Sequence, residues 1–284
     1  MGKLFVVGTP IGNLNDITKR QLDTLKSVDI ILCEDTRHSL KLLNYYQIRN
    51  KLISYHKFNE KEKTPYLIKE LIDNNKNIAL ITDAGMPCIS DPGYVLVNKA
   101  RENNIEVIGV GGISAVTTSL SVSGLDCKNF SFYGFFPREN KDKKNIIKEI
   151  KQSLINVFVF YESPKRIIST LEYLKEELGI FNICVCSDLT KIHEKTYYGN
   201  LDKVLNELKN NDKSELGEYT FIIEKIEKEK IKKEEISTEA LLIDTMIKYN
   251  ISMKDAIEKL NEISDNLSKK DIYNASLNIK KIIG

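Results

Sequence analysis

The chain has 284 residues, of which 42% are hydrophobic and 29% charged, which is enough for one large or two moderate globular domains. Forty-two Lys and Arg against forty Asp and Glu leave a net charge of +2, which excludes a polybasic protein that holds a polyanion by bulk charge. No apolar stretch approaches the roughly 18 residues that cross a bilayer, and the N-terminus does not have the pattern of a secretory leader. Five Cys without a CxxC pair favour neither a disulfide scaffold nor a zinc knuckle, so we expect a soluble, cytoplasmic protein.

Short β-branched runs alternate with amphipathic segments along most of the chain. The predicted strands are Leu4–Gly8, Ile30–Glu34, Ile78–Asp83, Val107–Val110, Phe130–Phe135, Val157–Tyr161, Ile183–Ser187 and Tyr219–Ile223, and predicted helices between them include Asp16–Lys26, Thr64–Asp73, Pro92–Asn103 and Pro164–Glu177. Nearly continuous apolar strands separated by helices predict an α/β protein with buried, largely parallel sheets.

Two changes in the sequence pattern divide the chain into predicted domains. The pattern pauses after the glycines that end at Gly112, which predicts two α/β domains, 1–112 and 113–224. A run of charged residues of both signs then predicts a solvated connector over 225–236. The remainder, 237–284, has two S-x-x-D helix caps, at Ser252 and Ser268, and predicts a small three-helix unit. This unit could be a helix-turn-helix nucleic-acid reader or a helical cap over the preceding domain.

Four loops that follow apolar strands carry the residues suited to chemistry. They are Gly8–Asn13, Glu34–Arg37, Asp83–Gly93 and Val110–Ala115, and open α/β sheets bind ligands at such strand ends. The first loop is no Walker loop, because no Gly-Lys-Ser/Thr follows, and the fourth lacks the third glycine and the later acid of a Rossmann fingerprint. For the first loop an ordinary strand–helix turn remains the alternative, and for the second a surface ion-pair cluster.

Charged groups also follow two later strands, in Tyr161–Arg166 and Asp188–Glu194, and could be catalytic, RNA-facing or structural. The three His, at 38, 56 and 193, form no recognisable metal or hydrolase triad, so we expect no metal site.

Seven ordered motifs together resemble one family. They are VGTPIGNLNDIT, CEDTRHS-KLL, TDAGMPCISDPG, GGISA, SGLDCKNFSFYGFFP, FYESPKR and DLTKIHE. Taken in this order they resemble the 16S ribosomal RNA (cytidine-2′-O)-methyltransferase family, which has the tetrapyrrole methylase fold, and the resemblance covers essentially the whole chain. It implies two α/β domains of the tetrapyrrole methylase type with a donor-binding cleft between them, plus a small C-terminal helical unit.

The resemblance also implies a reaction and its site residues. S-adenosylmethionine would be the methyl donor, a homodimer the active form, and the 2′-hydroxyl of a cytidine in the decoding region of 16S rRNA, naked or in the small ribosomal subunit, the acceptor. Donor contacts carried over by motif are Ile11, Asp83, Gly85, Met86, Ser114, Ala115, Tyr161, Tyr219 and Thr220, and the substrate-binding residues expected are Thr9, Pro10, Asn13, Arg37, Lys41 and Arg166.

The chain departs from the family pattern at a few positions. Met86 stands where threonine is usual, Gly112-Ile113 where Gly-Pro is usual, Ser187-Asp188 where Arg-Glu is common and His193 where phenylalanine is common. The first two could alter donor affinity, and the last two put the role of the Lys191 loop in doubt.

A general base is needed to take the proton of the 2′-hydroxyl. The candidates are Glu34, Asp35, Glu162 and Lys191, of which we favour the Glu34/Asp35 pair. For phosphate contact we expect Lys19, Arg20, Arg37, Lys41, Arg166 and the segment 138–151, which has six basic and three acidic residues. Two alternatives remain: C-methylation of a tetrapyrrole precursor on the same fold, and a non-catalytic RNA-binding ribosome-assembly factor.

Overall fold

The computed structural model describes residues 1–226, 237–263 and 267–283. The chain forms two compact units, Met1–Ile226 and Glu227–Gly284. From residue 227 onward the predicted connector lies outside the described residues, and the boundary predicted at 112/113 falls inside the first unit. Within the described ranges, none of the helices combines the length and apolar character needed to cross a membrane.

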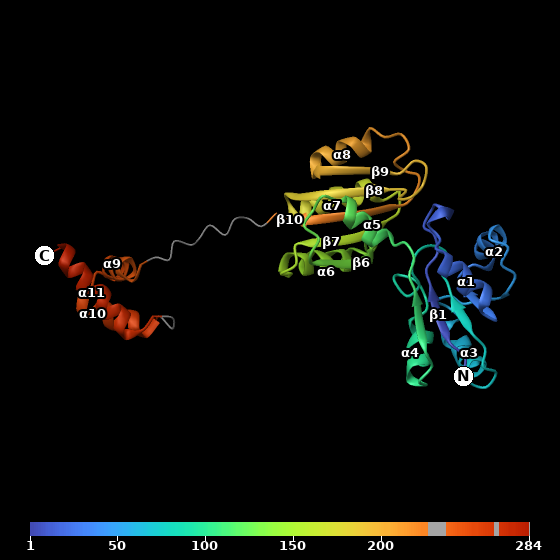
Figure 1. The fold of residues 1–284 in the computed structure, drawn as a ribbon. Coiled ribbons are helices and arrows are strands. Elements are labelled where there is room, and N and C mark those ends of the chain that lie inside the picture. The colour runs from blue at the N-terminus through green and yellow to red at the C-terminus, as the bar shows by residue number, and fades with distance from the viewer. Residues whose placement is uncertain (227–236, 264–266, 284) are drawn as a thin grey trace. The chain divides into compact units, whose positions relative to one another are not determined.

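The first sheet of the large unit is entirely parallel (Figure 1), as the apolar strands predict. Its strands are β1 (Leu4–Val7), β2 (Ile30–Cys33), β3 (Lys51–Ser54), β4 (Ile78–Leu80) and β5 (Val107–Val110), in the order β3-β2-β4-β1-β5. Between them run the 3₁₀ helix η1 (Leu14–Asp16) and the helices α1 (Lys19–Ser27), α2 (Thr36–Tyr45), α3 (Glu60–Ile72) and α4 (Tyr94–Glu102).

Helices cover both faces of this sheet, and each face has its own core. Leu25 of α1 and Leu43 of α2 pack on one face, and Leu67 of α3 and Leu96 of α4 on the other, all four with at most 1% of their surface exposed. Because parallel strands and their helices run in opposite directions, every strand end and every following helix N-terminus lie at one edge of the sheet. The predicted chemical loops are therefore collected at that edge.

The second sheet is mixed, so the prediction of largely parallel sheets is wrong here. Its strands are β6 (Phe130–Phe135), β7 (Val157–Glu162), β8 (Phe181–Ser187), β9 (Lys195–Asn200) and β10 (Tyr219–Lys225), in the order β6-β7-β10-β8-β9. Only β6 and β7 pair in parallel, and β10 lies between β7 and β8, antiparallel to both. The loop 188–194 is too short for the crossover that a parallel neighbour needs, so β9 returns antiparallel to β8.

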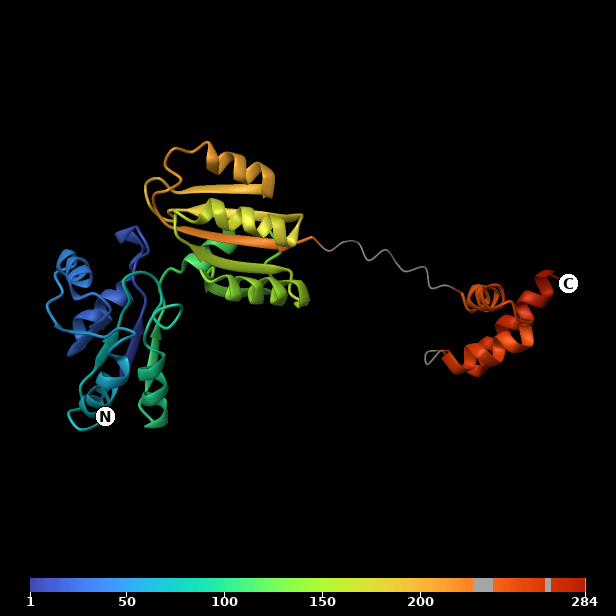
Figure 2. The same cartoon turned by 180° about the vertical axis from the view of Figure 1, so that it is seen from behind.

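The helices of the second sheet are distributed unequally between its faces (Figures 1 and 2). They are α5 (Ala115–Val122), α6 (Asn140–Gln152), α7 (Ile167–Leu178) and α8 (Leu201–Lys209). Side chains of α6, α7 and α8 form the larger core on one face, whereas α5 covers the other face with Val116 and Leu120.

The smaller unit contains the three helices that the sequence predicts, α9 (Thr238–Tyr249), α10 (Met253–Ile263) and α11 (Lys269–Ile283). Leu242, Leu260 and Ile272 belong to its buried core. Both predicted caps form, because the hydroxyls of Ser252 and Ser268 accept the backbone N–H groups of Asp255 and Asp271 at 3.3 and 3.2 Å. Whether this unit reads nucleic acid or caps a domain stays a prediction.

Sequence patterns missed two strands and misplaced the starts of the four named helices, which begin at Lys19, Glu60, Tyr94 and Ile167. β3 and β9 lie at sheet edges, begin with Lys and carry few apolar residues, so neither has the pattern of a buried strand. The helix predicted from Pro92 begins at Tyr94, because Gly93 adopts φ 135° as its N-cap.

Candidate active site

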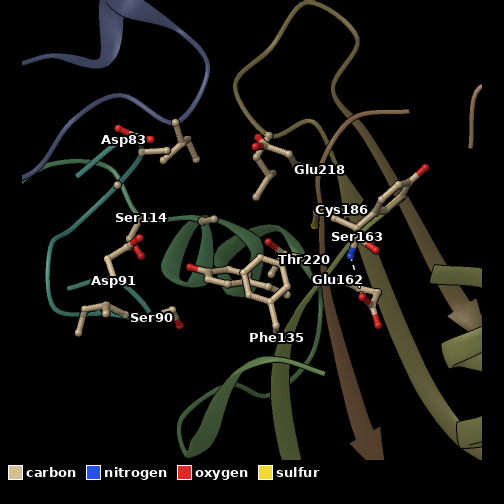
Figure 3. Close-up of a pocket in the computed structure, with 18 of the residues that line it drawn as sticks. Asp83, Ser90, Asp91, Ser114, Phe135, Glu162, Ser163, Cys186, Glu218 and Thr220 are labelled. Atoms are coloured by element: carbon tan, nitrogen blue, oxygen red, sulfur yellow. Dashed lines mark hydrogen bonds between the residues drawn. The ribbon is translucent and has the colours of Figure 1, made fainter. Parts of the chain in front are cut away.

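A cavity of about 390 Å³ lies between the two sheets of the large unit (Figure 3). The nine residues predicted to contact the donor, Ile11, Asp83, Gly85, Met86, Ser114, Ala115, Tyr161, Tyr219 and Thr220, all line it. Figure 3 shows Asp83, Asp91 and Ser114 along one side and Glu218 and Thr220 along the other. The structure brings these residues together, and their contact with a donor stays a prediction.

The cavity wall from the first sheet is made by two loops that are bonded to each other. Thr9 N donates to Gly85 O at 2.9 Å, Gly85 N donates to Thr9 O at 3.1 Å, and the Thr9 hydroxyl donates to Thr82 O at 3.0 Å. Thr9 is 0% exposed, so it joins the loops and is not placed to bind substrate as the resemblance implied. Met86 fits because its neighbour Gly8 has no side chain: a Cβ there would lie 2.7 Å from the Met86 sulfur.

Three carboxyl groups gather at the ends of β2 and β4. The Asp83 carboxylate accepts the backbone N–H of Asp35 at 3.4 Å, which ties the two strand ends together. Burial, with the charge of Asp83 adding to it, raises the pKa of Glu34. Burial, with the charges of Glu34 and Asp83 adding to it, raises the pKa of Asp91 to about 6. Among the described residues no cation forms an ion pair with any of the three.

Asp35 is a weaker candidate for a general base than its neighbour Glu34. Its carboxylate accepts hydrogen bonds from the Arg37 side chain at 2.8 and 3.2 Å and caps α2 by accepting the Arg37 backbone N–H at 2.8 Å. These bonds lower the pKa of Asp35, so the group holds a proton poorly. The geometry therefore separates the predicted pair and favours Glu34.

The arrangement of Glu162 argues against the predicted catalytic role. Its side chain is 0% exposed, and its carboxylate accepts from Ser163 N (Figure 3) and the Thr170 hydroxyl, both at 2.7 Å. Arg166 pairs with it at 3.2 Å and donates to the carbonyls of Phe136 and Pro137. Both charged groups are used inside the protein, so Arg166 is not free to contact a phosphate as predicted.

Lys191 is also held by neighbours that the sequence pattern does not reveal. Its ammonium group lies 2.9 Å from carboxylates of both Asp188 and Glu218. Desolvation acts to lower the pKa of Lys191, but the hydrogen bonds and charges of these two carboxylates outweigh it and raise the pKa overall. A lysine kept protonated in this way is unsuited to the role of general base.

Two further cavities border the first. One, of about 530 Å³, is lined by residues that include the predicted Pro10 and Lys41, and by Lys191. The other, of about 500 Å³, is lined by Glu34, Asp35, Thr36, Arg37, Ser54, His56, Lys57, Phe58 and Asp83. Asp83 lines all three cavities, so the cavity of about 390 Å³ meets both of the others at this residue. Asn13 caps η1 by accepting Asn15 N, and its contact with substrate stays a prediction.

Sequence reasoning did not assign some residues that line the central cavity. Asp91, Ser90, Phe135, Ser163 and Cys186 belong to this group. Asp91 had a usable signal, because it is the second acid of the dense loop Asp83–Gly93. Only the pairing of β10 beside β8 places Glu218 next to Lys191, a contact that no local pattern indicates.

A stripe of exposed lysines runs along α6 within the predicted basic segment. Lys141, Lys144, Lys148 and Lys151 follow each other at spacings of three, four and three, which places them on one side of a helix. Lys151 lies 3.8 Å from Glu177, and the other three form no ion pair with described residues. Lys19 and Arg20, at the start of α1, are exposed too. In the described ranges no three His, Cys, Asp or Glu residues are grouped so as to hold a metal ion.

Known proteins share both the fold and the sequence. One solved structure of similar fold is uroporphyrin-III-C-methyltransferase from Thermus thermophilus, with a TM-score of 0.52 and 16% sequence identity, covering 79% of this chain and 95% of that chain. Another is diphthine synthase, with a TM-score of 0.61 and 13% sequence identity, covering 78% of this chain and 90% of that chain. Curated relatives named "Ribosomal RNA small subunit methyltransferase I" are 39% identical in Halalkalibacterium halodurans, covering 96% of this chain and 94% of the relative, and 48% in Mesomycoplasma conjunctivae, covering 80% and 92%. Residues 3–205 match the Tetrapyrrole (Corrin/Porphyrin) Methylases. The chain therefore belongs to the tetrapyrrole methylase family and, within it, to the group of small subunit ribosomal RNA methyltransferases I.

Proposed function

We propose that this protein transfers a methyl group from S-adenosylmethionine to the ribose 2′-hydroxyl of a cytidine in 16S rRNA, as a homodimer in the cytoplasm. The observation that carries the proposal is the junction at Asp83, where the donor cavity opens beside Glu34, a carboxyl group with a raised pKa and no cationic partner among the described residues.

The central cavity fits the donor in size and chemistry. Ligand cavities start at about 300 Å³, so a volume of about 390 Å³ accommodates a small cofactor-sized molecule. Apolar side chains such as Ile11, Met86 and Leu189 suit the flat faces of an adenine, and carboxylates line the same cavity at Asp83 and Glu218. When bound, S-adenosylmethionine supplies a methyl group activated by a positively charged sulfur, which carboxylates stabilise.

In this proposal, residues of the first sheet carry the chemistry. Glu34, in its carboxylate form, accepts the proton of the 2′-hydroxyl, for which its raised pKa makes it a better acceptor than Asp35. Asp83, held by the backbone N–H of Asp35, lies where the cavities meet and orients the acceptor. The Thr9–Gly85 pair keeps the loops rigid, and such alignment provides much of the rate enhancement when the leaving group is good.

RNA binding and dimerisation have separate supports. The α6 lysine stripe (Lys141, Lys144, Lys148 and Lys151) offers positive charge for phosphates, and three of its four lysines, all but Lys151, form no ion pair with described residues. For the homodimer, the face of the second sheet covered by α5 exposes Val122, Phe130 and Tyr198 at 48%, 40% and 48%, an apolar surface suited to a second copy.

The proposal is tested by labelled methyl transfer from S-adenosylmethionine to unmodified small ribosomal subunits and, in parallel, to naked 16S rRNA. Digestion to nucleosides then locates the label, and we expect 2′-O-methylcytidine. Label on a base, or no label in RNA from a protein that binds the donor, would overturn the proposal. Label on a tetrapyrrole precursor instead would identify the carbon-methylating alternative, and the Glu34→Gln variant controls for contaminating methyltransferases.

A further inference from the structure

The turn after β3 presents an aromatic side chain to solvent beside the acid cluster. Phe58 is 94% exposed, and it lines the cavity of about 500 Å³ that also contains Glu34 and Asp83. A single exposed apolar side chain is common on protein surfaces, so what distinguishes Phe58 is its place at the rim of a polar cavity.

Hydrogen bonds on both sides of Phe58 hold the turn in shape. The Asn59 side chain accepts His56 N at 2.8 Å and donates to Ser54 O at 3.3 Å, and Lys63 donates to the same carbonyl at 2.6 Å. The His56 ring meets the Phe58 ring edge to face, with centroids 6.1 Å apart at 65°. An aromatic ring positioned in advance loses little entropy when a flat ligand stacks on it.

The surroundings of the ring specify the chemistry of that ligand. Lys57 lines the same cavity, as does the 89%-exposed side chain of Arg37, which is paired with Asp35. An aromatic face with cations at the rim matches an unstacked nucleotide, because bases stack on aromatic rings while cations contact the backbone.

We propose that Phe58 is a stacking platform for a nucleobase of a single-stranded RNA segment, at or next to the nucleotide whose ribose lies at Asp83. The inference deepens the proposed function and depends on it for the identity of the RNA. The strand then crosses the carboxyl edge of the first sheet, with the base at Phe58 and the 2′-hydroxyl between Glu34 and the donor cavity.

The first test compares substitutions that keep or remove the ring. Phe58→Ala should raise KM for unmodified small subunits about tenfold, with kcat and the KM for S-adenosylmethionine nearly unchanged, since base stacking contributes about 1–3 kcal/mol per base. Phe58→Tyr should restore the wild-type KM, and Phe58→Leu, which is apolar but not aromatic, should not. Because the ring is exposed, the melting temperature should stay constant. An unchanged KM for Phe58→Ala with an active wild-type protein would overturn the inference and leave the proposed function intact.

The second test does not need catalysis. The chain contains no Trp, so Phe58→Trp introduces a single tryptophan that can be excited selectively over the tyrosines. Tyr94→Trp, at a 70%-exposed position of α4 outside the three cavities, is the matched control. We expect single-stranded oligocytidylate to quench Phe58→Trp and not Tyr94→Trp. Equal quenching of both, or of neither, would contradict stacking. If Phe58→Ala impaired only assembled subunits and oligocytidylate failed to quench, Phe58 would contact a ribosomal protein and the inference would be wrong.

Discussion

Charged residues lie at the strand ends of both sheets of the large unit, but the two sheets differ in whether these residues form ion pairs. At the edge of the first sheet, Glu34, Asp83 and Asp91 lie together without an ion-pair partner among the described residues, and Glu34 and Asp91 have raised pKa values. At the second sheet, Glu162 is paired with Arg166, and Lys191 with Asp188 and Glu218.

Strand direction explains the difference. In the all-parallel first sheet, strand ends and helix N-termini meet at one edge, where no returning strand brings cations. In the second sheet, antiparallel β10 begins beside the end of β8, so Glu218 reaches the loop that carries Lys191. The first sheet therefore leaves carboxyl groups at its edge without ion-pair partners, whereas the charged residues of the second sheet form ion pairs with one another.

The largest expected effect concerns the free carboxyl group of the first sheet. Glu34→Gln should lower kcat by about 10²- to 10⁴-fold with little change in donor affinity, because the proton acceptor is lost. The wild-type rate should also fall at acid pH, as Glu34 becomes protonated at a pKa above its ordinary value, and the variant should lose this dependence. Asp35→Asn is the matched control; if it reduced kcat more than Glu34→Gln, the assignment of the base would be reversed.

The second effect concerns the paired carboxylate of the second sheet. Glu162→Ala should lower the free energy of unfolding by about 3–5 kcal/mol, because it leaves Arg166 and Thr170 without their buried partner. Denaturant titration measures this loss. Glu102→Ala, which removes a pair with Lys99 in which both side chains are about half exposed, should cost far less, because solvent screens an exposed pair. Equal losses for the two variants would remove the contrast between a structural and a surface pair.

A third effect is the pH dependence that Asp91 imposes on stability. Its folded pKa of about 6 lies above the value near 3.9 of an unfolded Asp, so the folded state retains a proton that the unfolded state releases. Stability should therefore fall as pH rises from about 4 to about 6, by less than the roughly 3 kcal/mol of the full shift because Asp91 is only partly buried. Asp91→Asn should be more stable than wild type above pH 6 and similar below pH 4 in melting experiments. A difference independent of pH would show that Asp91 is not protonated in the folded protein.

The smallest effect concerns the α6 lysine stripe. Lys144→Ala with Lys148→Ala should weaken binding to small subunits and lower the slope of log affinity against log salt by about 2. The control is Lys26→Ala with Lys69→Ala, in the last turns of α1 and α3, at the opposite edge from the strand ends. Identical slopes for the two double variants would exclude α6 from the RNA interface.

Much of the site is predictable because its signals are local. Apolar runs followed by Gly, Pro and Asp marked the loops at Gly8, Asp83 and Gly112, and the nine residues chosen by motif line one cavity. The edge strands β3 and β9 were not predictable, since an edge strand is only partly buried and does not need a continuous apolar run. The turn with Phe58 follows one of these missed strands, so its place beside Glu34 was missed with it.

The sequence by itself determined the alternation of strands and helices, the loops that carry chemistry and the three-helix unit, because hydrophobic periodicity and capping act over a few residues. Tertiary structure alone decided which charged residues have ion-pair partners and which do not. Glu34 directly follows an apolar strand and Glu162 ends one, yet Glu34 has a raised pKa and Glu162 is buried against Arg166 and Thr170. The Lys191–Glu218 contact joins residues 27 positions apart through the antiparallel pairing of β10. Such partners depend on strand order, which no local pattern encodes.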